Sequence, residues 1–121
     1  MRDRSSSFAE VRFIDRDRII EELRRAAAEA RNRYPEISRV LLFGSLVRGD
    51  WTADSDADLI VVVKREFSDL LERSPYQVFT SAIPTDTLVY SEAEFERLVT
   101  DRQNPLSEEL RCAITLLDKD G

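Results

Sequence analysis

The sequence predicts a small α/β (α+β) domain in which a mixed sheet is flanked by helices. Amphipathic segments of helical period alternate with short apolar runs along the chain. Residues 59–63 are apolar on both faces and β-branched, as is typical of a central strand covered on both sides. The length of 121 residues suits one modest core. We therefore expect a single domain over residues 1–121, with residues 1–14 as a partly flexible N-terminal arm.

The first elements are a helix and a strand. Apolar residues at helical spacing predict a helix over residues 15–34. Pro35 ends it because proline disfavours helical geometry in the residue before it. Residues 40–43 read as a short buried strand, residues 59–63 as the next strand and residues 85–90 as a third strand.

The segment between the second and third strands is the least readable. Residues 67–83 favour a helix that starts at Ser68 or Ser74, although residues 76–80 also have strand character. After the third strand, Ser91 is followed three residues later by Glu94. This pattern predicts a capping box at the start of another amphipathic helix.

A last helix is expected at the C-terminal end. Asn104 followed by proline offers a cap and a favourable first helical residue. Apolar positions at helical spacing continue to Leu117, so we expect the helix to extend that far, although its end could turn extended. On this helical face Cys112 would belong to the core.

Composition excludes several kinds of site and partner. The chain contains no histidine and one cysteine, which removes Cys/His zinc sites, disulfides and a histidine base. Its net charge of −6, with both signs interspersed, argues against a nucleic-acid partner but does not exclude a nucleotide. Neither a secretory signal nor a membrane span is visible. We therefore expect a soluble protein in the cytoplasm.

Three aspartates are the candidate catalytic and metal-binding residues. Asp56 and Asp58 stand two residues apart at the entrance of a strand, so their carboxylates point to one face. Their repulsion is relieved by a divalent cation, and Mg²⁺ favours carboxylate and phosphate oxygens. Asp86, on a neighbouring strand, could complete a trio that holds two metal ions roughly 4 Å apart. Because histidine is absent, Asp86 also suits acceptance of a proton from an attacking hydroxyl.

A glycine–serine turn supplies candidate phosphate ligands. Gly44 and Ser45 follow a strand and open a short helix, where backbone N–H groups and the helix dipole favour anions. The Ser45 hydroxyl could bind a phosphate oxygen or act only as a helix cap. Arg48 could contact phosphate or face solvent. Ser55 is a candidate for the same site, as a hydrogen-bonding support for the aspartates.

These motifs resemble those of a known family. Gly44-Ser45, ten further residues, and then Asp56-x-Asp58 before an apolar strand are similar to the DNA polymerase beta superfamily of nucleotidyltransferases. The variant Ser-Asp-x-Asp-Leu resembles the minimal nucleotidyltransferases of bacteria and archaea. The likeness covers roughly residues 40–98 and includes Asp86, the strand after it and the Ser-x-x-Glu-Phe helix start. It implies the nucleotidyltransferase fold.

The resemblance also implies a reaction. A nucleoside monophosphate, usually AMP from ATP, would be transferred to a hydroxyl with release of pyrophosphate. Gly44 and Ser45 would contact the triphosphate. Asp56 and Asp58 would bind two Mg²⁺ ions, for which Mn²⁺ could substitute. Asp86 would bind one of them and activate the acceptor.

The acceptor and partners are less defined by the sequence. Some minimal family members act as antitoxins that place AMP on a tyrosine of a HEPN-type ribonuclease toxin, so the resemblance implies such a partner as one possibility. A homodimer is another, and Trp51 reads as a packing or partner residue. The alternative is an antitoxin or regulatory subunit that acts by binding, with little or no catalysis. A small-molecule nucleotidyltransferase is less favoured, because no second domain is visible to build an antibiotic pocket.

Overall fold

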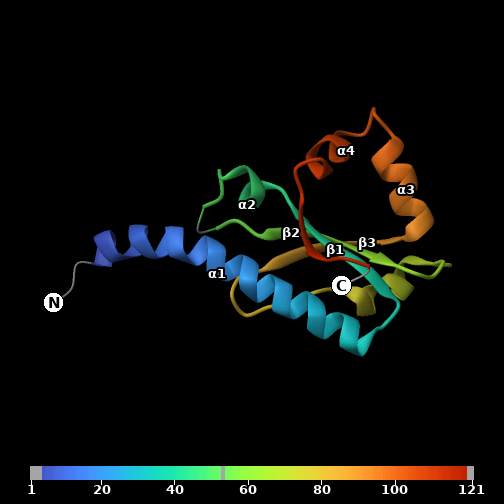
Figure 1. Cartoon of the computed structure of the whole chain (residues 1–121), viewed down its shortest axis with the longest axis horizontal. Coiled ribbons are helices and arrows are strands. Elements are labelled where there is room, and N and C mark those ends of the chain that lie inside the picture. The colour runs from blue at the N-terminus through green and yellow to red at the C-terminus, as the bar shows by residue number, and fades with distance from the viewer. Residues whose placement is uncertain (1–3, 53, 120–121) are drawn as a thin grey trace.

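The protein forms a four-stranded sheet with helices on both faces (Figure 1). The structure is a computed structural model that describes residues 4–52 and 54–119, with side chains from residue 16 onward. The strands are β1 (Ile37–Phe43), β2 (Ala57–Val63), β3 (Thr85–Ser91) and β4 (Ile114–Leu117). The helices are α1 (Arg4–Arg33), α2 (Ser45–Arg48), the 3₁₀ helix η1 (Leu70–Tyr76), α3 (Glu92–Thr100) and α4 (Pro105–Leu110).

The sheet is mixed, as the sequence predicts. Its strand order is β3-β2-β1-β4. β1 pairs antiparallel with β2 and with β4, and β2 pairs parallel with β3. α1 covers one face, whereas α3 and α4 lie on the other (Figure 1). The predicted class, a small mixed sheet flanked by helices, is confirmed.

The central strand β2 divides the core into two layers. Successive strand side chains point to opposite faces, so Leu59 and Val61 pack with Leu23 of α1. Ile60 and Val62 pack on the other face with residues of α3 such as Phe95. Both layers are buried, which explains why residues 59–63 are apolar at every position.

The candidate functional residues lie at one end of the sheet. β1 ends there at Phe43, and the antiparallel β2 begins there at Ala57. β3 is parallel to β2, so Thr85 begins at the same end. Ala57 N donates to the Pro84 carbonyl at 2.9 Å and ties the two strand starts together. The loops at this end therefore bring Gly44, the Asp56–Asp58 pair and Asp86 to one region.

The N-terminal helix is longer than the sequence indicates. α1 begins at Arg4 instead of near residue 15, so residues 4–14 of the expected arm belong to a helix and residues 1–3 lie outside the described part. No glycine or proline occurs between Arg4 and Arg33 to interrupt it. Its end is as predicted, immediately before Tyr34-Pro35. Among the described residues, no helix combines the length and apolar character that crossing a bilayer requires.

Residues 67–83 contain less regular helix than expected. Their helical part is η1, a 3₁₀ segment in which Pro75 lacks the N–H that a regular α-helix would use. The cap is Asp69, which accepts a hydrogen bond from Glu72 N at 3.1 Å, instead of Ser68 or Ser74. Residues 77–80 form no strand. The preference for helix is thus correct over Leu70–Tyr76 only.

The C-terminal part of the chain differs from the prediction in one respect. The predicted caps are present, because Ser91 and Glu94 form the capping box and Asn104 accepts from Leu106 N. However, α4 ends at Leu110, and the following residues form β4 against β1. The helix predicted through Leu117 is therefore wrong, and the extended alternative holds. Pairing with the open edge of β1 overrides the local helical pattern, and it leaves Cys112 exposed instead of in the core.

Candidate active site

The three predicted aspartates lie at the start of β2 and β3. Asp56 immediately precedes β2 and is exposed, Asp58 is the second residue of β2 and half-buried, and Asp86 is exposed on β3. In the parallel pairing Asp58 lies opposite Asp86, and in the antiparallel pairing it lies opposite Phe43. The structure therefore brings together residues that are 28 positions apart along the chain.

Asp58 sits in an excess of negative charge. Burial is the largest cause that raises the pKa of its carboxyl above the ordinary value, and the charge of Asp86 is the next. Glu109 and Asp56 also raise this pKa, whereas Arg48 lowers it. The site therefore resists ionisation of Asp58 on its own, and a bound cation would favour the charged carboxylate.

Gly44 is fitted directly against Asp58. It has φ +85°, a conformation that L side chains rarely adopt. A Cβ built on Gly44 would lie 2.2 Å from Asp58 Oδ2. Glycine is thus needed twice, once for the backbone turn after β1 and once for the close approach of the carboxylate. The predicted turn and the predicted acidic motif are one packed unit.

The turn continues into α2, a single four-residue helix. Its N-cap is Gly44, with no side-chain cap, so the reading of Ser45 as only a helix cap is wrong. Leu46 is fully buried, and its carbonyl accepts a hydrogen bond from Arg16 Nε at 2.9 Å. These contacts anchor α2 to α1. A helix this short has a small dipole, so any anion attraction at Ser45 would rest on backbone N–H groups.

Arg48 lies in an acidic network that the sequence does not reveal. Its Nε donates to Asp50 Oδ2 at 3.3 Å, and its Nη1 forms an ion pair with Glu109 of α4. Glu109 is the residue that sequence reasoning missed, because α4 is distant along the chain and carries no motif. Its charge also acts on Asp58. Through Glu109, α4 is electrostatically coupled to both the turn and the aspartates.

The loop between α2 and β2 is held by Ser55. Its Oγ accepts a hydrogen bond from Thr52 N at 2.9 Å and lies 3.4 Å from Thr52 Oγ1. These bonds lie within the loop and do not reach the aspartates, in contrast to the support that we expected. Trp51 is partly buried against the core, which favours the packing reading of this residue.

The donor set suits a divalent cation, but the side chains are not gathered as a finished metal site. Carboxylate oxygens are the ligands that Mg²⁺ prefers. Burial and the neighbouring carboxylates raise the pKa of Asp58 more than Arg48 lowers it, so a cation would stabilise the charged carboxylate. In the described part of the chain, no group of three or more acidic, cysteine or histidine side chains is arranged as a metal centre. The three aspartates would therefore have to come closer together to ligate one ion jointly.

Comparison with known families agrees with this fold and arrangement. Residues 20–114 match the model of the nucleotidyltransferase domain family, which is more than half of the chain. The chain belongs to this family. The matched region includes the glycine–serine turn and all three aspartates, so the resemblance inferred from the motifs is confirmed at the level of the family.

Two relatives show how far the likeness extends. A provisionally named protein adenylyltransferase of Methanocaldococcus jannaschii is 29% identical over 63 residues, which are 52% of this chain and 63% of that protein. The match thus spans less than two thirds of that relative. A crystal structure of a provisionally named nucleotidyltransferase from Sulfolobus solfataricus superposes with a TM-score of 0.64 at 19% identity. The superposition covers 89% of this chain and 87% of the Sulfolobus solfataricus chain, and it shows that the two proteins share a fold.

Proposed function

We propose that this protein is a Mg²⁺-dependent nucleotidyltransferase that transfers AMP from ATP to a hydroxyl group on a protein. Membership of the nucleotidyltransferase domain family supports the reaction class. The observation that carries the proposal is the position of Asp58, half-buried between the Gly44 turn and Asp86. Burial at this position raises the pKa of the Asp58 carboxyl, and a bound metal ion would stabilise its charged form. Such a carboxylate is suited to a metal-assisted reaction.

Each residue has a part in the proposed chemistry. Asp56, Asp58 and Asp86 would hold the metal ions, which would neutralise the triphosphate and stabilise charge on the attacking and leaving oxygens. Backbone N–H groups after Gly44, with the Ser45 hydroxyl, would bind phosphate oxygens. Asp86 would accept the proton of the acceptor hydroxyl. The oxygen of the acceptor hydroxyl would form a bond to the α-phosphorus of ATP. The bond between this phosphorus and the oxygen that bridges it to the β-phosphorus would break, and pyrophosphate would leave.

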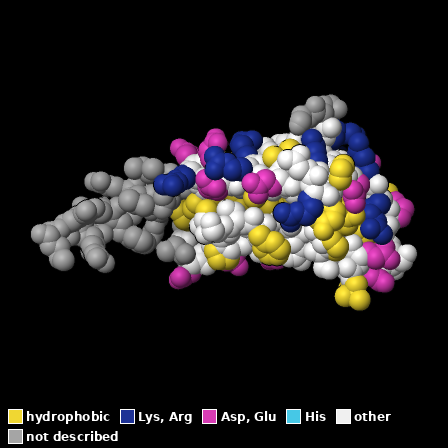
Figure 2. Space-filling model, turned by 90° about the horizontal axis from the view of Figure 1, so that it is seen from below, with side chains coloured by type: hydrophobic (Ala, Val, Ile, Leu, Met, Phe, Trp, Pro, Cys, Tyr) yellow, Lys and Arg dark blue, Asp and Glu magenta, His cyan; other side chains and the backbone are white. Residues whose placement is uncertain are grey.

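A protein acceptor is supported by the relative from Methanocaldococcus jannaschii, whose name describes a protein adenylyltransferase. By resemblance to minimal nucleotidyltransferases in toxin–antitoxin pairs, the candidate acceptor is a tyrosine of a HEPN-type toxin partner. A nucleic-acid acceptor is not favoured. The net charge is −6, and basic and acidic side chains are intermixed on the face that Figure 2 shows.

The donor half of the proposal can be tested without knowing the acceptor. ATP with MgCl₂ or MnCl₂ should raise the melting temperature of the protein in a metal-dependent way, because ligands that bind the folded state stabilise it. The Asp56→Asn/Asp58→Asn double variant should lose this rise. Glu96→Gln, which removes an exposed carboxylate from α3, serves as a control and should keep it. An equal rise in the double variant would refute the assigned site.

A binding role without catalysis is the second candidate. It is favoured by Arg48, whose guanidinium is already held by Asp50 and Glu109 instead of facing an open phosphate site. Under this reading the protein would neutralise a partner by contact alone. Complete neutralisation of a co-expressed HEPN-type partner by the Asp56→Asn/Asp58→Asn variant would select this second reading over the first.

A further inference from the structure

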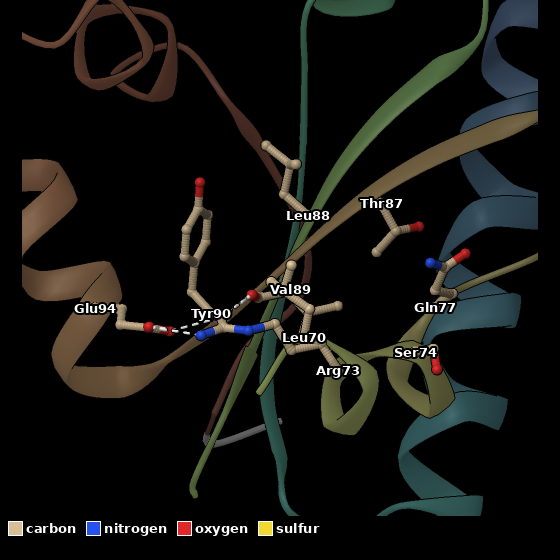
Figure 3. Close-up of a pocket in the computed structure, with 9 residues that line it drawn as sticks. All are labelled: Leu70, Arg73, Ser74, Gln77, Thr87, Leu88, Val89, Tyr90 and Glu94. Atoms are coloured by element: carbon tan, nitrogen blue, oxygen red, sulfur yellow. Dashed lines mark hydrogen bonds and ion pairs between the residues drawn. The ribbon is translucent and has the colours of Figure 1, made fainter. Parts of the chain in front are cut away.

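A groove with a cavity volume of about 470 Å³ lies beside the candidate active site, along β3 (Figure 3). Leu70 and Gln77, from η1 and the residue after it, form one side, and Leu88 and Tyr90 of β3 form another. The groove is outside the site described so far, because it is lined by none of the three aspartates.

The groove is continuous with the site through β3. Side chains alternate along a strand, so Asp86, Leu88 and Tyr90 point to the same face. In Figure 3 the side chains of Leu88 and Tyr90 rise on the same side of the strand. The spacing along an extended chain places Leu88 about 7 Å from Asp86 and Tyr90 about 13 Å from it. A single row of side chains therefore leads from the reacting end into the groove.

The groove also lies on the side of the site away from the phosphate turn. The order of the strands is β3-β2-β1. Asp86 lies at the start of β3, Asp58 at the start of β2, and Gly44 directly after the end of β1. The candidate phosphate-binding turn is at β1, and the groove is along β3. A donor nucleotide bound at Gly44 would thus leave the β3 side of the site open to the acceptor.

Three properties of the groove select a polypeptide as its occupant. β3 is at the margin of the sheet, so one side of its backbone has no strand partner. Leu70 is 80% exposed and Leu88 is 39% exposed, which offers apolar contact at the rim. The one basic residue in the lining, Arg73, is already engaged, since its two terminal nitrogens donate to Glu94 at 2.8 Å and to Val89 O at 2.7 Å. A phosphate backbone would find no available cation there.

We propose that this groove is the acceptor subsite, which binds an extended polypeptide segment that presents a hydroxyl side chain to Asp86. An apolar side chain two residues away along that segment contacts Leu70 and Leu88, because an extended acceptor has nearly the same rise per residue as β3. This inference rests on the proposed nucleotidyl transfer and adds the class and the local pattern of its acceptor.

Matched variants make the proposal testable. Leu70→Ser/Leu88→Ser alters the groove, and Leu71→Ser/Val99→Ser is the control. Leu71 and Val99 are 81% and 39% exposed and lie outside the groove lining, so the two variants remove equally exposed apolar side chains. The probe is a positional-scanning peptide library with one fixed tyrosine, labelled by α-³²P-ATP and MgCl₂.

The expected result is a preference for an apolar residue two positions from the tyrosine. The groove variant should lose this preference and raise the KM for the preferred peptides about tenfold, the effect of losing one buried apolar contact. Its kcat and its Mg²⁺-ATP melting shift should stay unchanged. The control variant should behave as the wild type.

Three results would overturn the proposal while the proposed function survives. In the first, the groove variant keeps the preference for an apolar residue two positions from the tyrosine. In the second, the groove variant and the control variant lose this preference equally. In the third, Mg²⁺-ATP stabilises the protein but no peptide is labelled. A self-association measured by sedimentation and abolished only in the groove variant would assign the groove to a second copy instead. Failure of the Mg²⁺-ATP melting shift would refute the proposed function itself, and this inference with it.

Discussion

Asp58 on β2 and Asp86 on β3 are register partners across a parallel strand pair. Burial is the largest cause that raises the pKa of the Asp58 carboxyl, and the charge of Asp86 is the next. Like charges on adjacent strands destabilise a sheet unless another group balances them. The sequence therefore keeps two acidic residues at a position where stability alone would not favour them. Such conflicts between local stability and residue choice are expected at functional sites.

The first prediction separates stability from function. Asp86→Asn removes the repulsion on Asp58, so the metal-free protein should become more stable by about 0.5 kcal/mol, as expected for one like-charge pair on adjacent strands. The same variant should lose nucleotidyl transfer. Urea unfolding with EDTA present measures the first effect, and Glu66→Gln, an exposed carboxylate away from this end of the sheet, serves as the control. A destabilised Asp86→Asn protein would argue against this account of the pair.

The second prediction compares two glycines that both have positive φ but differ in ψ. Gly49, with φ +90° and ψ 4°, is in the left-handed α region, where alanine should cost about 1–2 kcal/mol of stability. Gly44, with φ +85° and ψ −151°, is in a region adopted almost only by glycine, where alanine should cost about 1–3 kcal/mol. Only at Gly44 would the new Cβ meet Asp58, because nothing lies within 4 Å at Gly49. Gly44→Ala should therefore abolish the Mg²⁺-ATP melting shift, and Gly49→Ala should retain it. Equal loss in both variants would mean that the contact with Asp58 has no special role.

The site was predictable to the extent that its parts are local in sequence. The glycine–serine turn and the Asp56–Asp58 pair are separated by ten residues and read as one motif, and their packing agrees with that interpretation. Glu109 was not predictable, because its approach to Arg48 depends on how α4 folds back over the sheet. The hydrogen bonds of Ser55 also could not be read from the sequence, because they depend on the shape of its loop.

The third prediction concerns Glu94 at the start of α3. Its carboxylate accepts hydrogen bonds from Arg73 at 2.8 Å and from Ser91 N at 2.8 Å. The bond from Arg73 is the largest cause that lowers the pKa of Glu94 from 4.5 to about 2. A pKa shift of this size corresponds to a contribution of about 3 kcal/mol to the free energy of unfolding. Because the side chains are partly exposed, solvent screening reduces this contribution to about 1–2 kcal/mol. Glu94→Gln should lower the free energy of unfolding at pH 7 by that amount.

The pH dependence of this effect has a defined sign. A carboxyl whose pKa is lowered in the folded state stabilises the protein above its unfolded pKa of 4.5. That contribution is lost as the pH falls through about 2. The difference between wild type and Glu94→Gln should therefore shrink between pH 5 and pH 2 in urea titrations. A difference that stays constant over this range would show that the ion pair is not its source.

The fourth prediction tests the coupling of α4 to the site. Glu109 pairs with Arg48 and adds negative charge near Asp58. Glu109→Gln should free Arg48 for phosphate and reduce repulsion of the triphosphate, so the Kd for Mg²⁺-ATP should fall about threefold, a small electrostatic gain. Calorimetric titration measures this change, with Glu108→Gln, which is also on α4, as the control. Weaker binding in Glu109→Gln would show that Glu109 assists the nucleotide.

The fold shows the same division between local and distant causes. Signals within one turn or one strand were predictive, including the capping box at Ser91, the cap at Asn104 and the central strand over residues 59–63. The C-terminal helical pattern failed because residues 114–117 pair with β1. That choice depends on an open strand edge far away in the chain, and no local pattern reports it.

Nucleotidyl transfer from labelled ATP is the most direct test of the central claim, which is that the aspartates beside Gly44 transfer AMP. The protein is incubated with MgCl₂ and either α-³²P-ATP or γ-³²P-ATP, together with a candidate protein acceptor such as a neighbouring HEPN-type protein. We expect label from α-³²P-ATP on the acceptor, none from γ-³²P-ATP, and none with the Asp56→Asn/Asp58→Asn variant. Transfer of the γ-label, or α-label transfer that survives in the double variant, would contradict the claim.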